Sequence, residues 1–368
     1  MEKHIILDYM TPKRVHFFKS LDYLLQNAGY KIIRIARDYG ETINLLENKG
    51  LNYDLILQWG KDSLESKLKV YADNINVILD YINKNNLNIK AFITLMDPSI
   101  SRVAYGLSKP LINFSDLPDA IIPGKLSLTL SDYIYIPFCI SERYISENYC
   151  ISKEKIYKYP FLDPVLWLKD YIPSKKEELF SSLNIPEKYL NKKLIYARLE
   201  PLNANYYMSI NHKKSLILEL IENILKEYND DIFIIIHPRY KEKLQLYQNI
   251  ENIKIINENL VDSISIAANA DLFIGGGGTI NIEAIYFGTP VISVKPVLTL
   301  YEKYLVENGL SYRASNIYNK TESFKLIKKI LENNIRLHNK DISKLWEGNL
   351  NESIKKFEED FLAFIEKL

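Results

Sequence analysis

Short apolar runs alternate with amphipathic stretches along almost the whole chain, a pattern typical of strand and helix units that build a parallel sheet. The first half contains the runs HIILDY, YKIIRIARD, YDLILQW, AFITLMD, PLINFSD and YIYIPF. The second half contains KLIYARLE, DIFIIIHPR, NIKIINE, DLFIGGGG and TPVISVK. The sequence therefore predicts an α/β fold with two successive parallel-sheet domains.

The two series of runs are separated by a segment, from about 156 to 193, that has four prolines and no clear alternation. We interpret this segment as the connection between the domains. The predicted boundaries are 1–165 for the first domain, 166–190 for the connection and 191–345 for the second domain. In the remaining segment, 346–368, we expect an amphipathic helix that crosses back to the first domain, with these apolar residues: Ile354, Phe357, Phe361 and either Phe364 or Ile365.

Composition and charge exclude several classes of function. The 47 basic and 46 acidic residues leave a net charge of +1, which gives no electrostatic footprint for nucleic acid. Cys139 and Cys150 form no CxxC pair and the five histidines show no metal-ligand spacing, so we expect no metal site. No apolar run approaches the roughly 18 residues of a membrane span, and we expect a protein of the reduced cytoplasm. The segment SERYISENYCISKEKIYKYPF leaves a peripheral membrane contact open, although such tyrosines are more often packing residues.

Four consecutive glycines, Gly275 to Gly278, stand between the strand DLFI and the helix TINIEAIYFG. Ligands of parallel-sheet domains bind beyond the carboxyl ends of the strands, where helix N-termini present unpaired N–H groups. Glycines allow a phosphate to approach the backbone, and the helix dipole favours its negative charge. Thr279 is the expected N-cap of the helix. The alternative is a tight strand-to-helix turn that needs only small residues.

The type of phosphate ligand is narrowed by the neighbouring residues. The run is not a P-loop, because no Gly-Lys-Ser/Thr follows it. A dinucleotide fingerprint would occupy the first strand-to-helix turn, and DYMTPKRVHFF has no glycine there. A carboxylate at Glu283 repels phosphate but can accept hydrogen bonds from a ribose diol. Together these features predict a nucleoside diphosphate in the second domain.

The segment GGGGTINIEAIYFGTPVIS resembles the nucleotide-binding signature of GT-B glycosyltransferases and of the non-hydrolysing UDP-N-acetylglucosamine 2-epimerases. The chain as a whole is more similar to a largely archaeal family of GT-B-like proteins, the domain of unknown function 354. This likeness is carried by the glycine-rich run, by ARLEPLNANY and by DYMTPKRVHFFKSLDYLLQNAGYKIIRIARD. It implies a GT-B fold, with two Rossmann-like parallel-sheet domains and an active site in the cleft between them.

The resemblance also implies roles for residues of the second domain. Glu283 would bind the ribose hydroxyls, and the diphosphate would lie against the glycine-rich turn. His237 and Arg239, in the short motif HPR, would face the diphosphate, although a histidine after a strand is often only structural. Arg198 would neutralise the departing diphosphate, or else pair with Glu200. The complete predicted nucleotide-sugar site of this domain comprises Gly275, Gly276, Gly277, Gly278, Thr279, Asn281, Glu283, His237, Arg239 and Arg198.

The first domain would supply the acceptor site and the base. Asp97 and Asp116 each follow a strand where the epimerases carry an acidic residue, and we expect one of them to be the catalytic carboxylate. Both could equally be helix caps. His16 would act as the base or contact the substrate. Arg14 is loosely comparable to a phosphate-gripping arginine of the epimerases, and the related family usually has a histidine in its place.

Three functions remain open at this level. The first is a glycosyltransferase that uses a nucleoside diphosphate sugar, with a UDP-sugar favoured, and an unknown acceptor. It would need neither a metal nor another cofactor, because the helix N-terminus supplies positive potential. The second is a 2-epimerase that eliminates and re-adds UDP, with Asp97, Asp116 and His237 transferring protons. The third is a protein that binds a nucleotide sugar without turnover.

Overall fold

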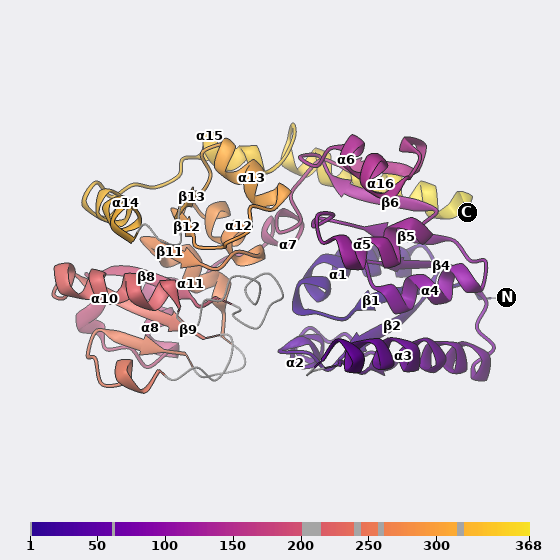
Figure 1. The fold of residues 1–368 in the computed structure, drawn as a ribbon, viewed down its shortest axis with the longest axis horizontal. Helices are drawn as coiled ribbons and strands as arrows, with labels where there is room; N and C mark the ends of the chain where they lie inside the picture. Colours follow the sequence, from indigo (N-terminus) through magenta and orange to yellow (C-terminus); the bar gives the residue numbers. More distant parts are fainter. Residues whose placement is uncertain (1, 61–62, 201–214, 239–243, 257–260, 315–319) are drawn as a thin grey trace. The chain divides into compact units, whose positions relative to one another are not determined.

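The computed structural model describes the chain except for residue 1 and the segments 61–62, 201–214, 239–243, 257–260 and 315–319 (Figure 1). The chain divides into two compact units. Unit 1 comprises Met1–Trp167 together with Trp346–Leu368, and unit 2 comprises Leu168–Leu345. Each unit contains one sheet in which every strand pairing is parallel. The predicted α/β class, with two successive Rossmann-like parallel-sheet domains, is confirmed.

The sheet of unit 1 has the strand order β3-β2-β1-β4-β5-β6-β7 (Figure 1). Its strands read as continuous apolar runs because helices cover both faces of the sheet. Their bounds are β1 His4–Tyr9, β2 Lys31–Arg37, β3 Leu55–Leu57, β4 Ile89–Thr94, β5 Leu111–Phe114, β6 Tyr133–Pro137 and β7 Ile156–Tyr159. The helices are α1 Pro12–Asn27, α2 Thr42–Asn48, α3 Leu64–Lys84, α4 Pro98–Gly106, α5 Ile121–Ser127, α6 Glu142–Tyr149, α7 Val165–Leu168 and α16 Leu350–Lys367.

The two faces of this sheet are buried by different helices. On one face, α3 and α4 pack their apolar residues against Ile6 and Ile33. On the other, Phe17 and Phe18 of α1 contact the ring of Phe114 in β5. α1 ends as expected, with Gly29 at a φ of +87° just after its last turn.

Helix α16 belongs to unit 1, although it follows unit 2 in the sequence. Asn349 caps it by accepting hydrogen bonds from two backbone N–H groups of its first turn. Its buried residues are Ile354, Phe357, Phe361 and Ile365, which is the apolar stripe expected from the sequence. The Phe361 ring lies 5.8 Å from the ring of Phe114 and 5.4 Å from that of Tyr135, so the helix completes the aromatic core of this face.

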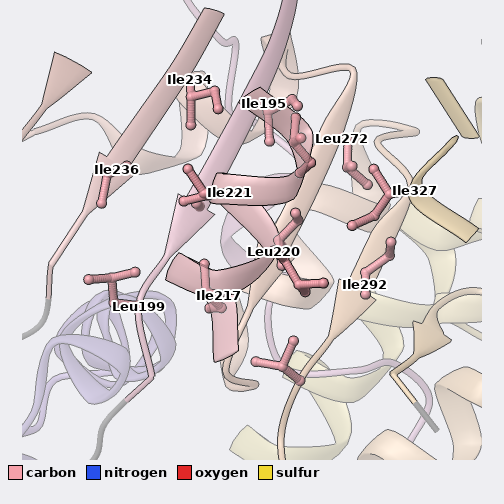
Figure 2. Packing of buried hydrophobic residues seen from close by; sticks show 14 of the residues in the cluster. Ile195, Leu199, Ile217, Leu220, Ile221, Ile234, Ile236, Leu272, Ile292 and Ile327 are labelled. Carbon is pink, nitrogen blue, oxygen red and sulfur yellow. The ribbon is translucent and has the colours of Figure 1, made fainter. Parts of the chain in front are cut away.

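The sheet of unit 2 has the order β10-β9-β8-β11-β12-β13. Its strands are β8 Lys193–Arg198, β9 Ile232–His237, β10 Ile253–Ile255, β11 Leu272–Gly275, β12 Val291–Ser293 and β13 Tyr312–Arg313. Its helices are α8 Lys176–Ser182, α10 Leu216–Tyr228, α11 Ser263–Asn269, α12 Thr279–Tyr286, α13 Leu300–Glu307, α14 Lys320–Glu332 and α15 Asn339–Ile342. Figure 2 shows Ile217, Leu220 and Ile221 of α10 packed among strand residues that include Ile195 and Ile234. The apolar residues of this core lie along the strands, whereas polar residues stand at the carboxyl ends of several strands.

The structure departs from the sequence prediction at two strands. β7 was not predicted as a strand, because Ile156–Tyr159 lies in the segment without clear alternation, although the predicted first domain, 1–165, includes it. β13, with two residues, was not predicted at all. Both strands are at the edge of their sheet, where one side is unpaired and the apolar signal is short. No helix in the part of the chain that the structure describes is long and apolar enough to cross a membrane.

Candidate functional site

The carboxyl edge of the unit 2 sheet carries a row of directly paired residues. His237 of β9 pairs with Arg198 of β8, and Arg198 pairs with Gly275 of β11. Gly275 pairs in turn with Ser293 of β12, and Ser293 with Arg313 of β13. Because neighbouring parallel strands are about 4.8 Å apart, consecutive members of this row lie side by side. Two predicted site residues, His237 and Arg198, therefore end strands on the same edge as the glycine-rich turn.

The glycine-rich turn leads directly into α12. Gly277 and Gly278 have φ angles of +87° and +104°, a region that side chains other than glycine rarely adopt. Gly278 is the N-cap of α12, and no side chain caps the helix. The expectation that Thr279 is the N-cap is wrong, because Thr279 is already the first helical residue. An uncapped helix start leaves backbone N–H groups available to an anion.

Three side chains restrict the space around the turn. A Cβ atom on Gly275 would lie 2.5 Å from Cε1 of Phe273 and 2.9 Å from Oδ1 of Asn281. A Cβ atom on Gly277 would lie 2.6 Å from Cδ of Lys295. The glycines therefore admit Asn281 and Lys295 to the backbone of the turn, and a larger residue would displace them.

Lys295 is a candidate site residue that was missed from the sequence. It follows β12, and its Nζ lies 3.5 Å from Oγ1 of Thr299, the N-cap of α13. Arg313 donates to the backbone carbonyls of Lys295 and Pro296, at 3.2 and 2.7 Å, and so holds the segment in place. Lys295 could have been found from its position just after the run TPVIS, because this run ends at the same sheet edge as the glycines.

Asn281 and Glu283 bring hydrogen-bonding groups to the first turns of α12. Asn281 is 3% exposed, and among the described residues its Oδ1 has no hydrogen-bond partner. A buried polar atom without a partner costs about 1–3 kcal/mol, which a ligand group bound there would offset. Glu283 is also buried, one turn along the same helix. These side chains could bind the hydroxyl groups of a ligand whose phosphates lie at the helix N-terminus.

His237 has a defined orientation at the end of β9. Its Nδ1 lies 2.7 Å from the hydroxyl oxygen of Tyr196, and the histidine side chain is buried. Glu200, the alternative partner considered for Arg198, accepts hydrogen bonds from Ser215 and from the backbone N–H of Ile217 at the start of α10. Arg239 lies outside the described residues.

In unit 1, Asp97 and Arg14 lie in one buried ion-pair network. Asp97 caps α4, with its Oδ1 accepting from the N–H groups of Ser99 and Ile100, and its Oδ2 lies 2.9 Å from Arg37. Arg14 donates to both carboxylate oxygens of Asp8, at 2.7 and 2.6 Å. Asp97 therefore has the capping position that we considered as its alternative role. Neither Asp8 nor Arg37 was recognised from the sequence, because their partners come from different strands.

His16 lies on α1 with its ring 5.5 Å from that of Trp167. Burial, reinforced by the charges of Lys49 and Lys19, lowers the pKa of His16 from its usual value to about 3. The imidazole is therefore neutral at physiological pH and a weak base. Asp116, which follows β5, lies 2.5 Å from Nζ of Lys13. In the described part of the chain, no group of three His, Cys, Asp or Glu residues could hold a metal ion.

Gly277→Ala is expected to lower the free energy of unfolding by about 2 kcal/mol or more. The change places a side chain at positive φ, which costs about 1–2 kcal/mol, and it also displaces Lys295. Gly309→Ala is the matched control, because Gly309 has a φ of +70° and no neighbour within 4 Å of its Cβ position. Urea denaturation of both variants measures the difference. Equal losses would show that Lys295 does not restrict Gly277.

The pKa of His16 predicts an acid-dependent loss of stability. The unfolded chain binds a proton at His16 near pH 6.5, whereas the folded chain does so near 3. Stability from this residue is therefore complete above about pH 6.5 and falls as the pH decreases towards 3. Between pH 7.5 and 5, wild type should lose up to about 2 kcal/mol more than His16→Gln. Parallel pH dependences of the two urea transitions would contradict this expectation.

Comparison with known proteins places the chain in a family. The family model described as "Protein of unknown function (DUF354)" matches residues 3–354, and the chain belongs to this family. Uncharacterized protein MJ0665 of Methanocaldococcus jannaschii is 28% identical over 316 residues, which cover 84% of this chain and 87% of that protein. The resemblance to this family noted in the sequence is thereby confirmed.

Solved structures similar to this chain include two kinds of enzyme. The UDP-GlcNAc 2-epimerase from Neisseria meningitidis, bound to UDP-GlcNAc, matches with a TM-score of 0.75 and 16% identity over 99% of this chain and 100% of that chain. The spinosyn rhamnosyltransferase SpnG, complexed with spinosyn aglycone, matches with a TM-score of 0.59 and 12% identity over 100% of both chains. At these identities the likeness shows the fold alone, and that fold is GT-B.

Proposed function

We propose that this member of the family is a GT-B glycosyltransferase that binds a nucleoside diphosphate sugar in unit 2 and transfers the sugar to an acceptor. The observation that carries the proposal is the uncapped start of α12. There, Gly275 and Gly277 bring Asn281 and Lys295 against the backbone. A UDP-sugar is the favoured donor, because the similar epimerase structure contains UDP-GlcNAc.

The diphosphate would lie at the N-terminus of α12, next to Lys295. Both the helix dipole and the lysine ammonium stabilise negative charge, and this charge increases as the diphosphate leaves the sugar. Each hydrogen-bond donor already positioned for such a leaving group lowers the activation free energy by about 3 kcal/mol. Arg198 and His237, on neighbouring strands of the same edge, would add to this field. These groups would supply the positive potential without a metal ion or another cofactor.

The nucleoside would be recognised along α12. Glu283 would accept hydrogen bonds from the ribose hydroxyls. The ionised diphosphate has no hydrogen atom to donate to a carboxylate. Asn281 would bind a ligand group through the buried oxygen that has no partner among the described residues. The acceptor is undefined. Two free cysteines, Cys139 and Cys150, agree with a reducing compartment such as the cytoplasm.

A 2-epimerase acting on a UDP-N-acetylhexosamine is the second candidate, favoured by the fold shared with the Neisseria meningitidis enzyme. The contacts of Asp97 argue against this candidate. Its two oxygens are already bound by α4 and by Arg37. Product analysis separates the candidates: an epimerase yields an isomerised sugar nucleotide, whereas a transferase releases the nucleotide and glycosylates an acceptor. A protein that only binds the nucleotide sugar would give neither product.

Calorimetric titration with UDP, GDP, ADP, CMP and their sugar conjugates tests the binding proposal. We expect one nucleoside diphosphate to bind preferentially to wild type. Glu283→Gln should weaken binding about tenfold, because it removes one charge-assisted hydrogen bond. Lys295→Met should weaken binding about tenfold to a hundredfold, because it removes the cation beside the diphosphate.

Lys303→Met is the control, because Lys303 is an exposed lysine of the nearby helix α13. It should bind as wild type does. A folded wild-type protein that binds none of these nucleotides would contradict the proposed function.

A further inference from the structure

Helices α4 and α5 lie side by side in unit 1, and their exposed sides carry large apolar residues next to basic ones (Figure 1). Ile122 is 70% exposed and Tyr105 is 59% exposed. We call this surface the α4–α5 patch, and its residues are Arg102, Tyr105, Ile121, Ile122, Lys125 and Leu126. Large apolar side chains gathered on neighbouring helices indicate an interaction surface, whereas single exposed ones need no explanation.

α5 is inverted relative to an ordinary surface helix, which buries its apolar stripe. Its buried residues are Gly124 and Ser127, whereas its two isoleucines and its leucine are exposed and belong to the patch. A Cβ atom on Gly124 would lie 2.6 Å from Cζ of Tyr149, so the glycine allows the ring from α6 to pack closely against α5. Packing within unit 1 therefore does not account for the apolar residues of this helix.

The exposed charges of the patch have one sign. Neither α4 nor α5 contains an acidic residue, and their basic residues are Arg102 and Lys125. Among the described residues, neither of these cations forms an ion pair. Of the two carboxylates between the helices, Asp116 is paired with Lys13 and Asp119 is half-buried. The exposed surface is thus both apolar and cationic.

The neighbouring helix α6 has a different surface. It begins the segment SERYISENYCISKEKIYKYPF, in which a membrane contact was left open. Tyr149 and Tyr159 of this segment are buried, so they are packing residues. On α6, Arg143 lies 2.6 Å from a carboxylate oxygen of Glu147, so its charge is balanced within the helix. The apolar and cationic surface is therefore that of α4 and α5.

The chemistry of the patch favours a lipid surface over a second copy of this chain. A two-fold interface would bring the patches of both copies together. Their positive charges would then meet with no carboxylate of either patch to pair with. In contrast, an anionic membrane offers lipid phosphates to basic residues and an apolar boundary to isoleucine and leucine. The ring of Tyr105 suits this boundary, because it has an apolar body and a polar tip.

We infer that the α4–α5 patch binds unit 1 to the surface of an anionic lipid membrane. This inference goes beyond the proposed function and does not depend on it. Ile122 and Leu126 enter the boundary between headgroups and acyl chains, and Tyr105 lies at the level of the headgroups. Arg102 and Lys125 contact the lipid phosphates.

Co-sedimentation with lipid vesicles tests the inference on the full chain. The protein should bind vesicles of phosphatidylglycerol mixed with phosphatidylcholine about tenfold more tightly than vesicles of phosphatidylcholine alone. Added salt should weaken binding to the anionic vesicles, because it screens the lipid phosphates. Failure of the wild-type protein to bind the anionic vesicles, or equal binding to both kinds, would overturn the inference.

Single substitutions separate the patch from the rest of the surface. Ile122→Ser should weaken vesicle binding about tenfold, because it removes an inserted apolar side chain. Lys125→Ser should weaken it about fivefold, because it removes one cation from the anionic surface. The matched controls are Leu246→Ser in unit 2, where the leucine is 84% exposed, and Lys355→Ser on α16, where the lysine side chain is 77% exposed. Both controls should bind as wild type does, and patch variants that bind no more weakly than the controls would overturn the inference.

Two further measurements do not depend on how vesicle binding changes in the variants. Hydrogen exchange of the wild-type amides should become slower in 98–106 and 121–127 when anionic vesicles are added. Protection confined to other segments would overturn the inference. Sedimentation velocity should give the same mass for wild type and Ile122→Ser without lipid. A wild-type dimer that Ile122→Ser converts into a monomer would assign the patch to a second copy and overturn the membrane contact.

Discussion

Parallel strand pairing is the constraint on which both candidate sites depend. In a parallel sheet all carboxyl ends lie along one edge, so residues far apart in the sequence become neighbours there. In unit 2 this pairing aligns His237, Arg198, Gly275, Ser293 and Arg313. The helix that follows β11 then begins at the same edge without a side-chain cap. An anion bound at this position would be stabilised by groups that the fold has already fixed.

The two units differ in the polar residues at the carboxyl edge of their sheets. In unit 1, carboxylates and cations neutralise one another, as in the pairs Arg14 with Asp8 and Arg37 with Asp97. Removing one member of such a buried pair would cost about 3–5 kcal/mol, because the other charge would remain buried. In unit 2, the glycine-rich turn presents backbone N–H groups and a lysine instead. This difference supports the proposal that the diphosphate binds in unit 2.

Much of the fold could be predicted from the sequence, because long apolar runs and the α16 stripe are local signals. The strand β7 could not, because Ile156–Tyr159 is a short edge strand with two exposed residues. The glycine-rich turn was located correctly from its composition, but the N-cap was assigned one residue too late. Lys295, Asp8 and Arg37 were missed for a common reason. Each gains its importance from a partner on another strand or helix, and a single sequence does not show which residues meet in space.

Hydrogen exchange of the backbone amides, measured with and without UDP, tests whether a diphosphate binds at the start of α12. Ligand oxygens bound at the start of α12 would accept hydrogen bonds from the amides that no side chain caps. We expect slower exchange in the segment 276–281 when UDP is bound, together with slower exchange around Lys295. Saturating UDP that leaves exchange in 276–281 unchanged, or that protects only amides elsewhere, would contradict a diphosphate site at this turn.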